Sequence, residues 1–450
     1  MTTLSSEDLA PITSALSRAN TAFIQTYPGE SNARQPVHTV YGGGHLFKSD
    51  TARRLGDTAI RNLEEYAPDP ETFAHAFNLD RDRDLPIATA LRARVLEKLQ
   101  REPTEDFRLD YEDGYGNRLD SEEDAHAAQG ATEVAKGLAD GTLPPFIGIR
   151  IKPMNEDLRA RATRTLDIFI TTLIQQTDGK LPDNFVITIP KVQIAEQVIA
   201  VVQLFRLLEK KLNLAPDTLR MELMLETPQA IIGRDGKITL PSLIEATQGR
   251  CTGVHFGVYD YTAGRNITAA YQGMSHPVCD FAREIMAVSL AGTGIFLSDG
   301  ATNILPVGPH RAAEGQTLTK EQTTENHIAV HQAWNLAYRD TQHSLKNGIY
   351  QGWDLHPGQF IARYAAVYQF FQSGHAAAAS RLKAFVSKAA LASLHGDVFD
   401  DAATGQGLLN FFLRGISCGA ITEAEAQETG LTLEEIRTRS FLKILLGRRK

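Results

Sequence analysis

Short apolar runs alternate with longer amphipathic stretches along most of the chain. The short runs are typical of buried strands, and the longer stretches repeat apolar residues every three or four positions, which is typical of helices. Eight strands are predicted in this way, near residues 38, 109, 149, 187, 223, 255, 296 and 353, and helices separate most of them. Because this alternation indicates a parallel sheet and eight units are what a closed barrel requires, we expect an α/β protein with a (β/α)8, or TIM, barrel.

An open doubly wound sheet is the alternative architecture. Such sheets usually carry a glycine-rich turn with the spacing GxGxxG after the first strand. Here the first predicted strand ends at Gly42-Gly43-Gly44, which lacks that spacing. The backbone N–H groups of Gly43 and Gly44 could still approach a phosphate or carboxylate, so both are candidate substrate-binding residues. A tight turn is the structural alternative for these two glycines.

Three regions are predicted. Residues 1–36 hold an N-terminal helix, over 5–26, and a lead-in; residues 37–360 form the barrel; residues 361–450 form a helical C-terminal extension. An insertion follows the first strand, where residues 51–66 and 86–101 read as helices. The polar stretch between these two helices is interpreted as an insertion or a lid.

Composition narrows the possible functions. The 450 residues carry a formal net charge of -8, which argues against broad nucleic-acid binding but not against a local basic pocket. The three cysteines are widely spaced and form no CxxC motif, which fits a reducing cytoplasm. No signal peptide and no run long enough to span a bilayer are found, so we expect a cytoplasmic protein without a membrane partner.

Two acidic residues end consecutive apolar runs. Glu226 follows the run that begins at Met221, and Asp260 follows the run that begins at Gly253. The carboxyl ends of barrel strands meet at one mouth, so these acids should lie close together. Two carboxylates with waters suit Mg²⁺, or Mn²⁺, as the cofactor. We therefore predict Glu226 and Asp260 as metal ligands of an enzyme; the structural alternative is that each caps a helix or pairs with an arginine.

A buried arginine is the next candidate. Arg150 lies in the apolar run Ile147–Ile151, on the face that should point into the barrel. A buried guanidinium needs an anionic partner, either a structural acid or a substrate carboxylate, which its planar fork binds through two hydrogen bonds. Glu112 and Asp113 follow the second strand, beside Asp110. These three acids cap the next helix or serve as counter-ions of Arg150, and the two roles are compatible, because one acid can hold Arg150 in place.

Two further candidates end strands. Lys191 follows the fourth strand and could form a Schiff base, stabilise charge or lie on the rim; a Schiff base would make the metal redundant. His356 follows the last strand, where it is either a substrate-binding residue or a packed, hydrogen-bonded histidine.

With these residues in place, the chain resembles the citrate lyase beta subunit-like family, within the HpcH/HpaI aldolase, malyl-CoA lyase and malate synthase group. The resemblance spans residues 37 to 360 and rests on six short segments, in order, each at a strand end. They are Leu109-Asp-Tyr-Glu-Asp113, Gly148-Ile-Arg-Ile151, Ile189-Pro-Lys-Val192, Leu225-Glu-Thr-Pro228, Phe256-Gly-Val-Tyr-Asp260 and Leu355-His-Pro-Gly-Gln359.

The resemblance implies a Mg²⁺-dependent carbon–carbon lyase or aldolase that works through a metal-stabilised enolate. Glu226 and Asp260 would hold the metal, and Arg150 would bind a carboxylate or enolate oxygen, supported by Glu112 or Asp113. The implied substrate is a small 2-oxo acid or a hydroxyacyl coenzyme A thioester, and the implied assembly is a homo-oligomer.

Two other functions stay open. The first is phosphoryl transfer on phosphoenolpyruvate or pyruvate, which needs a phosphate cradle or a mobile phosphohistidine; His356 is the one histidine predicted at the mouth. The second is a barrel that has lost its chemistry and serves as a binding or regulatory subunit, because a fold does not determine a function.

Overall fold

A computed structural model describes residues 3–29, 31, 33–79, 81–387, 393–395, 398–400 and 402–448. Eight parallel strands close into a barrel in sequence order, with the last strand paired to the first. The strands are β1 (His38–Gly43), β2 (Asp106–Asp110), β3 (Phe146–Arg150), β4 (Phe185–Ile189), β5 (Arg220–Leu225), β6 (Cys251–Phe256), β7 (Phe296–Ala301) and β8 (Gln351–Asp354). The predicted (β/α)8 barrel is confirmed, and each strand contains or adjoins its predicted position.

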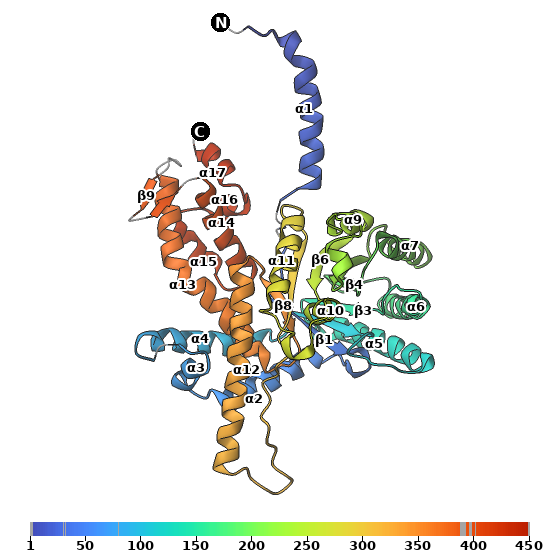
Figure 1. Ribbon diagram of the computed structural model, residues 1–450, viewed down its shortest axis with the longest axis vertical. Coiled ribbons are helices and arrows are strands. Elements are labelled where there is room, and N and C mark those ends of the chain that lie inside the picture. Colours follow the sequence, from blue (N-terminus) through green and yellow to red (C-terminus); the bar gives the residue numbers. More distant parts are fainter. Residues whose placement is uncertain are drawn as a thin grey trace.

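Helices connect the strands and cover the barrel (Figure 1). Between β1 and β8 these are α2 (Thr51–Tyr66), α3 (Pro70–Ala76), α4 (Arg81–Arg101), α5 (Asp120–Asp140), α6 (Arg159–Gln176), α7 (Ala195–Lys211), α8 (Pro228–Ile231), α9 (Leu240–Ala246), α10 (Val258–Gly264), α11 (Pro277–Leu290) and α12 (Lys320–Lys346). The 3-10 helices η1 (Gly44–Leu46) and η2 (Ala269–Tyr271) complete the connections. Figure 1 shows α1 (Ser6–Thr26) extending away from the barrel.

The strand register explains where the core lies. Leu109 of β2 pairs with Ile149 of β3, which pairs with Ile187 of β4, and all three are buried. Successive strand side chains point to opposite faces, so this set packs under the helices while its neighbours point into the barrel. The interior neighbours include Arg108 and Glu222, whose side chains form an ion pair of 2.8 Å inside the barrel.

The insertion after β1 is helical through most of its length. The stretch predicted as an insertion or a lid contains α3, which packs against α4 and α12. Phe73 and Phe77 carry this packing, since both are buried and their rings stack edge to face. The sequence did not reveal α3 because its seven residues are too few to show a helical period.

The C-terminal extension is helical, as predicted. It holds α13 (Gln359–Ser387), α14 (Ala402–Ser417), α15 (Glu423–Ala426), η3 (Gln427–Thr429), α16 (Leu433–Arg437), α17 (Phe441–Arg448) and a two-stranded sheet of β9 (Ser393–His395) and β10 (Val398–Asp400). The helix α13 contacts α12 and α14, so the extension packs beside the barrel rather than standing free (Figure 1).

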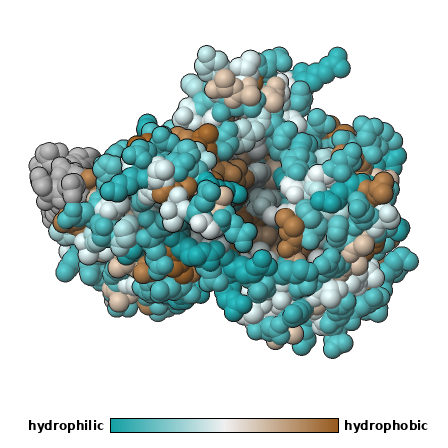
Figure 2. Space-filling view, turned by 90° about the horizontal axis from the view of Figure 1, so that it is seen from below, coloured by the Kyte–Doolittle hydropathy of each residue, from teal (hydrophilic) through white to brown (hydrophobic). Residues whose placement is uncertain are grey.

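Hydrophilic residues cover most of the face seen from below, and this face is hollowed near its centre (Figure 2). Among the described residues, no helix combines the length and the apolar character that crossing a bilayer requires.

Candidate active site at the carboxyl ends of the strands

Four of the predicted site residues lie at the same mouth of the barrel. Arg150 is the last residue of β3, Lys191 follows β4 and Glu226 follows β5. Asp260 was predicted to end a strand, but β6 ends at Phe256 and Asp260 lies in the first turn of α10. Its position is still at the mouth, because its carboxylate lies 3.5 Å from the ammonium group of Lys191.

Arg150 is held by a structural acid. Its Nε donates a 2.7 Å hydrogen bond to Oδ1 of Asp110, and its Nη2 bonds the other oxygen of the same carboxylate. Asp110 also accepts the backbone N–H groups of Glu112, at 2.9 Å, and Gly114, at 2.6 Å. The acid is therefore fixed by four donors, and it occupies one full edge of the guanidinium fork. Of the three guanidinium nitrogens, Nη1 is the one that does not bond Asp110.

The remaining side of Arg150 has only a weak hydrogen-bond acceptor, because Nη1 donates to the sulfur of Met224 at 3.6 Å. Nη1 lies 3.2 Å from Oε2 of Glu112 and 3.9 Å from Asp113. The guanidinium carbon also lies 4.7 Å from the centroid of the Tyr41 ring. Among the described residues, Oε2 of Glu112 and the hydroxyl of Tyr41 are buried without a hydrogen-bond partner. A buried carboxylate oxygen that lies this close to a guanidinium without a hydrogen bond is a place where a polar ligand would complete the bonding.

Lys191 contacts acidic residues that follow three different strands. Its ammonium group bonds Glu112, and it lies 3.2 Å from Asp113 and 3.5 Å from Asp260. Its backbone N–H donates to Oε1 of Glu226 at 2.7 Å. Burial would lower the pKa of Lys191, but Glu226 and Glu112 outweigh burial and raise this pKa above its ordinary value. The amine therefore stays protonated, which disfavours the Schiff-base interpretation.

The backbone at Lys191 is also unusual. Its φ is 50°, in the left-handed region that residues with a side chain rarely adopt. This conformation directs the N–H toward Glu226 while the side chain reaches the acids after β2. Such local strain persists where surrounding contacts hold it, and it is frequent at functional sites.

Of the two predicted metal ligands, Glu226 is more buried than Asp260. It is 2% exposed, and burial raises its pKa to about 8, with a further upward contribution from Asp260 and opposition from Lys191. The backbone of Gly257 passes directly against it: a Cβ at Gly257 would lie 2.4 Å from both Cβ and Oε2 of Glu226. A glycine is therefore required at this position for the carboxylate to keep its place.

The donor set of this cluster fits a hard divalent cation. Five carboxyl groups and two cationic groups are linked by the contacts above, so the fully ionised cluster carries an excess of three negative charges. They are Asp110, Glu112, Asp113, Glu226 and Asp260, with Arg150 and Lys191. A divalent cation would offset most of this excess, and carboxylate oxygens are its preferred ligands. Among the described residues, no group of three or more acidic, histidine or cysteine side chains is arranged to hold a metal, so a cation at this mouth would have Glu226 and Asp260 as its two protein ligands and would keep several waters.

The predicted glycine turn has a packing explanation. A Cβ at Gly43 would lie 2.7 Å from the carbonyl oxygen of Gly114, and one at Gly44 would lie 2.6 Å from the ring of Tyr111. Both glycines are therefore needed for β1 to approach the segment after β2, whether or not a substrate also lies there. Their role in substrate binding stays a prediction.

His356 is engaged in its own turn. Its Nδ1 accepts the backbone N–H of Gly358 at 3.1 Å, and its own N–H donates to Gln359 at 3.1 Å. Burial lowers the pKa of its ring. No histidine among the described residues makes a polar contact with Arg150 or Lys191. The local bonding supports the structural alternative for His356.

Two residues of the cluster were missed as site residues. Asp110 was considered only as part of an acidic group, although it is the direct partner of Arg150. Tyr41 was not predicted as a site residue. The signal for Asp110 was present in the sequence, since it pairs across the ladder with Arg150 if the second and third strands are neighbours. Nothing in the sequence marked the buried hydroxyl of Tyr41.

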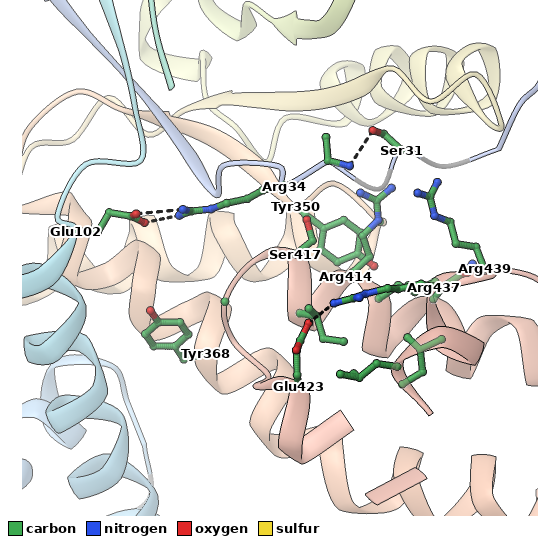
Figure 3. A pocket seen from close by; sticks show the side chains of 18 of the residues that line it. Ser31, Arg34, Glu102, Tyr350, Tyr368, Arg414, Ser417, Glu423, Arg437 and Arg439 are labelled. Atoms are coloured by element: carbon green, nitrogen blue, oxygen red, sulfur yellow. Dashed lines mark hydrogen bonds and ion pairs between the residues drawn. The ribbon is translucent and has the colours of Figure 1, made fainter. Parts of the chain in front are cut away.

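A cavity of about 890 Å³ lies at the opposite end of the barrel. Its lining includes Arg34, which precedes β1, Arg101, which precedes β2, and Tyr350, which precedes β8, together with residues of the extension. Figure 3 shows the labelled side chains of Arg34 and Arg414 beside it. None of the predicted site residues lines this cavity, so it is separate from the cluster at the carboxyl ends.

Comparisons with known proteins agree with the fold. A family model described as "Domain of unknown function (DUF6986)" matches residues 16–444. No curated protein is significantly similar to the chain. Among solved structures, a citrate lyase from Burkholderia xenovorans LB400 is similar, with 15% identity and a TM-score of 0.56, over 88% of this chain and 96% of that one.

Two further solved structures are more distant. The protein CitE from Mycobacterium tuberculosis, in complex with magnesium, acetoacetate and coenzyme A, has 14% identity and a TM-score of 0.46, over 86% of this chain and 100% of that one. The malate synthase of Haloferax volcanii has 12% identity and a TM-score of 0.45, over 79% and 91%. At these identities the likeness concerns the fold, and the resemblance to the citrate lyase beta subunit-like family in particular stays a prediction.

Proposed function

Since the chain belongs to the DUF6986 family, whose description assigns no activity, we propose its function from the site itself: a Mg²⁺-dependent lyase or aldolase that breaks or forms a carbon–carbon bond next to a carbonyl group. The observation that carries this proposal is the mouth cluster, in which the buried Glu226 and nearby Asp260 lie beside the charged groups of Arg150 and Lys191. The Burkholderia protein with the same fold is described as a citrate lyase, which agrees with this class of reaction.

Three side chains at or near the mouth would bind an anionic substrate. Arg150 offers Nη1 to a substrate carboxylate or enolate oxygen, because Asp110 occupies its other edge. Burial raises the pKa of Tyr41 well above its ordinary value, so its unpaired hydroxyl stays protonated and remains available as a hydrogen-bond donor. Lys191 keeps its positive charge close to this position. These groups favour a small anionic substrate.

Glu226 and Asp260 would hold the metal, and a bound Mg²⁺ supplies Lewis-acid stabilisation of developing negative charge. Cleavage leaves the bonding electron pair on the fragment that becomes an enolate, and the other fragment leaves as a carbonyl compound. The hydroxyl group next to the broken carbon–carbon bond loses its proton as it becomes a carbonyl group, and the enolate carbon finally gains one proton, so no further reactant is needed. A 2-oxo acid that carries a hydroxyl group on the second carbon from its ketone, or a 3-hydroxyacyl thioester, satisfies this chemistry in the direction of cleavage.

The test is a turnover and thermal-shift screen with Mg²⁺ against pyruvate, oxaloacetate, glyoxylate, phosphoenolpyruvate, acetyl coenzyme A and malyl-type thioesters. We expect Mg²⁺-dependent cleavage or condensation that Glu226→Gln and Asp260→Asn abolish. The exposed acid Asp235, in the turn after α8, gives the matched control Asp235→Asn, which should keep full activity.

Three results would contradict the proposal. Folded protein without any response to metal or 2-oxo acids would indicate a non-catalytic barrel. Phosphoenolpyruvate-dependent labelling of His356 would indicate phosphoryl transfer. Full activity of both carboxylate variants would remove the metal assignment.

A further inference from the structure

The N-terminal helix α1 has no contact with the body that buries any of its residues. Its large apolar side chains are open to solvent, with Ile12 at 64% and Phe23 at 63% exposure. Figure 1 shows the helix extending beyond the barrel, with its N-terminal end farthest from the rest of the chain. A helix with this much exposed apolar surface is a candidate for binding another protein surface.

The apolar residues of α1 form one continuous face. Leu9, Ile12, Leu16, Ala19 and Phe23 alternate in steps of three and four, which places them on a single stripe of the helix, here called the arm stripe. The opposite face carries the polar residues Glu7, Ser14, Arg18, Thr21 and Gln25. This division is typical of a helix that is buried on one side only.

Packing within the chain does not stabilise α1, because none of its residues is buried. Most helical stability in proteins comes from the packing of an amphipathic face rather than from the helix itself. Pro11 lies inside α1 and lacks the backbone N–H that the helix would use there. The ordered α1 therefore requires a surface that covers its arm stripe.

A matching surface lies on α11. Val278, Phe281, Ile285 and Val288 also alternate in steps of three and four, and we call them the receiving stripe. Phe281 is 46% exposed and Val288 is 70% exposed, so the outer part of this stripe faces solvent. The arm stripe spans roughly 21 Å and the receiving stripe roughly 15 Å, at 1.5 Å per helical residue, so the two can lie along one another.

The attachment of α1 decides which copy of α11 it can reach. The chain after α1 is tied to the end of α11, because the N–H of Gly29 donates to the carbonyl of Gly292 at 2.8 Å. From this attachment point α1 extends away from the body, beyond the end of α11, and does not lie along α11 (Figure 1). To cover α11 of the same chain, α1 would have to reverse its direction. A second copy approaching from outside meets both stripes without any such reversal.

We propose that α1 is an exchanged arm: in a dimer of this chain, the arm stripe of each copy packs on the receiving stripe of α11 in the other. This arrangement is isologous: the two-fold axis of the dimer relates two identical contacts. Each arm stripe is therefore buried against a receiving stripe, and neither stripe is left exposed. A membrane surface fits less well. Residues 6–26 carry two acids and a single arginine, whereas helices that lie on anionic membranes are rich in lysine and arginine.

The first test is the association state of the full chain, measured by sedimentation velocity. We expect a dimer for the wild type, and a monomer for the arm variant Leu9→Ser, Ile12→Ser, Leu16→Ser. A matched control changes two residues on the polar face of the same helix, Ser14→Ala and Thr21→Ala, and should remain dimeric. Since none of these residues is buried within one chain, all variants should keep the circular dichroism spectrum of the folded barrel. A wild-type monomer, or an arm variant that stays dimeric, would overturn the proposal.

The second test separates exchange from folding back. One chain carries Leu16→Cys, a tagged second chain carries Val288→Cys, and the mixture is treated with a short bis-maleimide. The native Cys251, Cys279 and Cys418 are buried and so are shielded from the reagent. A covalent heterodimer supports the exchanged arm. A cross-linked monomer in the double variant, with no heterodimer in the mixture, would show that α1 covers its own α11 instead. A monomeric chain that binds phosphatidylcholine–phosphatidylserine vesicles through α1 would assign the helix to membranes.

Discussion

Replacing Glu226 by glutamine is expected to make the metal-free protein more stable at neutral pH. Glu226 is buried, and burial raises its pKa from 4.5 to about 8, with Asp260 adding to the rise. A carboxyl whose folded pKa is raised contributes stability that is fully present below its unfolded pKa and is lost as the pH rises through the folded value. Glutamine stays neutral throughout, and its side-chain oxygen can still accept the N–H of Lys191, which bonds Oε1 at 2.7 Å.

The size of the effect follows from the pH window between these two pKa values. At pH 7 this carboxyl is ionised in the unfolded chain, whereas it keeps its proton in the folded chain. Between pH 4.5 and pH 7 this difference in protonation lowers the free energy of unfolding of the wild type by about 3 kcal/mol. At pH 5 the same reasoning yields less than about 1 kcal/mol, because the unfolded carboxyl is then still partly protonated. The stability gained by the variant should therefore grow as the pH rises from 5 to 8.

Urea unfolding in the presence of EDTA, at pH 5, 7 and 8, measures this difference for the wild type, Glu226→Gln and the control Asp235→Asn. The control removes an exposed carboxyl and should follow the wild type at every pH. Adding Mg²⁺ should then stabilise the wild type and leave Glu226→Gln unchanged. A glutamine variant that is no more stable than the wild type at pH 7, or a difference independent of pH, would refute the reasoning.

Three further substitutions test the geometry of the mouth. Asp110→Asn should lower the free energy of unfolding by about 3–5 kcal/mol, because it leaves the buried guanidinium of Arg150 without its charged partner. The double variant Asp110→Asn, Arg150→Met removes that guanidinium and keeps a side-chain oxygen for the backbone N–H groups that Asp110 accepts, so it should recover most of this loss in urea unfolding, and no recovery would contradict the pairing. Arg150→Lys keeps the charge but loses the fork, so we expect kcat/KM to fall by at least roughly tenfold, and a near-wild-type rate would mean that Arg150 is purely structural. Gly257→Ala would place a Cβ 2.4 Å from Glu226, so Mg²⁺ binding measured by calorimetry should weaken by roughly tenfold while Gly273→Ala, at a position with open space, has no effect. Equal affinity in both glycine variants would show that the backbone at Gly257 can shift.

The sequence alone determined the barrel and the end of it that carries the candidate site. Strand and helix periods are local properties, so eight apolar runs separated by amphipathic stretches were enough to predict the order and parallel pairing of β1 to β8. The rule that strand ends converge then brought Lys191 and Glu226 together correctly, because closing a parallel sheet leaves all its carboxyl ends at one mouth. Asp260 reached the mouth from a helix rather than a strand, since the apolar run around it continues past the end of β6.

Only the tertiary structure decided how the side chains at that mouth are used. The sequence left open whether Arg150 binds a structural acid or a substrate, and the structure shows Asp110 on one edge of the fork and Nη1 directed elsewhere. Lys191 bonds Glu112, which lies 79 positions earlier in the chain. Periodic patterns describe only neighbouring positions, so they cannot predict a contact at this separation. Such partners depend on side-chain reach and burial once the barrel has closed. The same limit applies to α1, whose amphipathic pattern is local, while its lack of any covering surface within one chain is a property of the folded molecule.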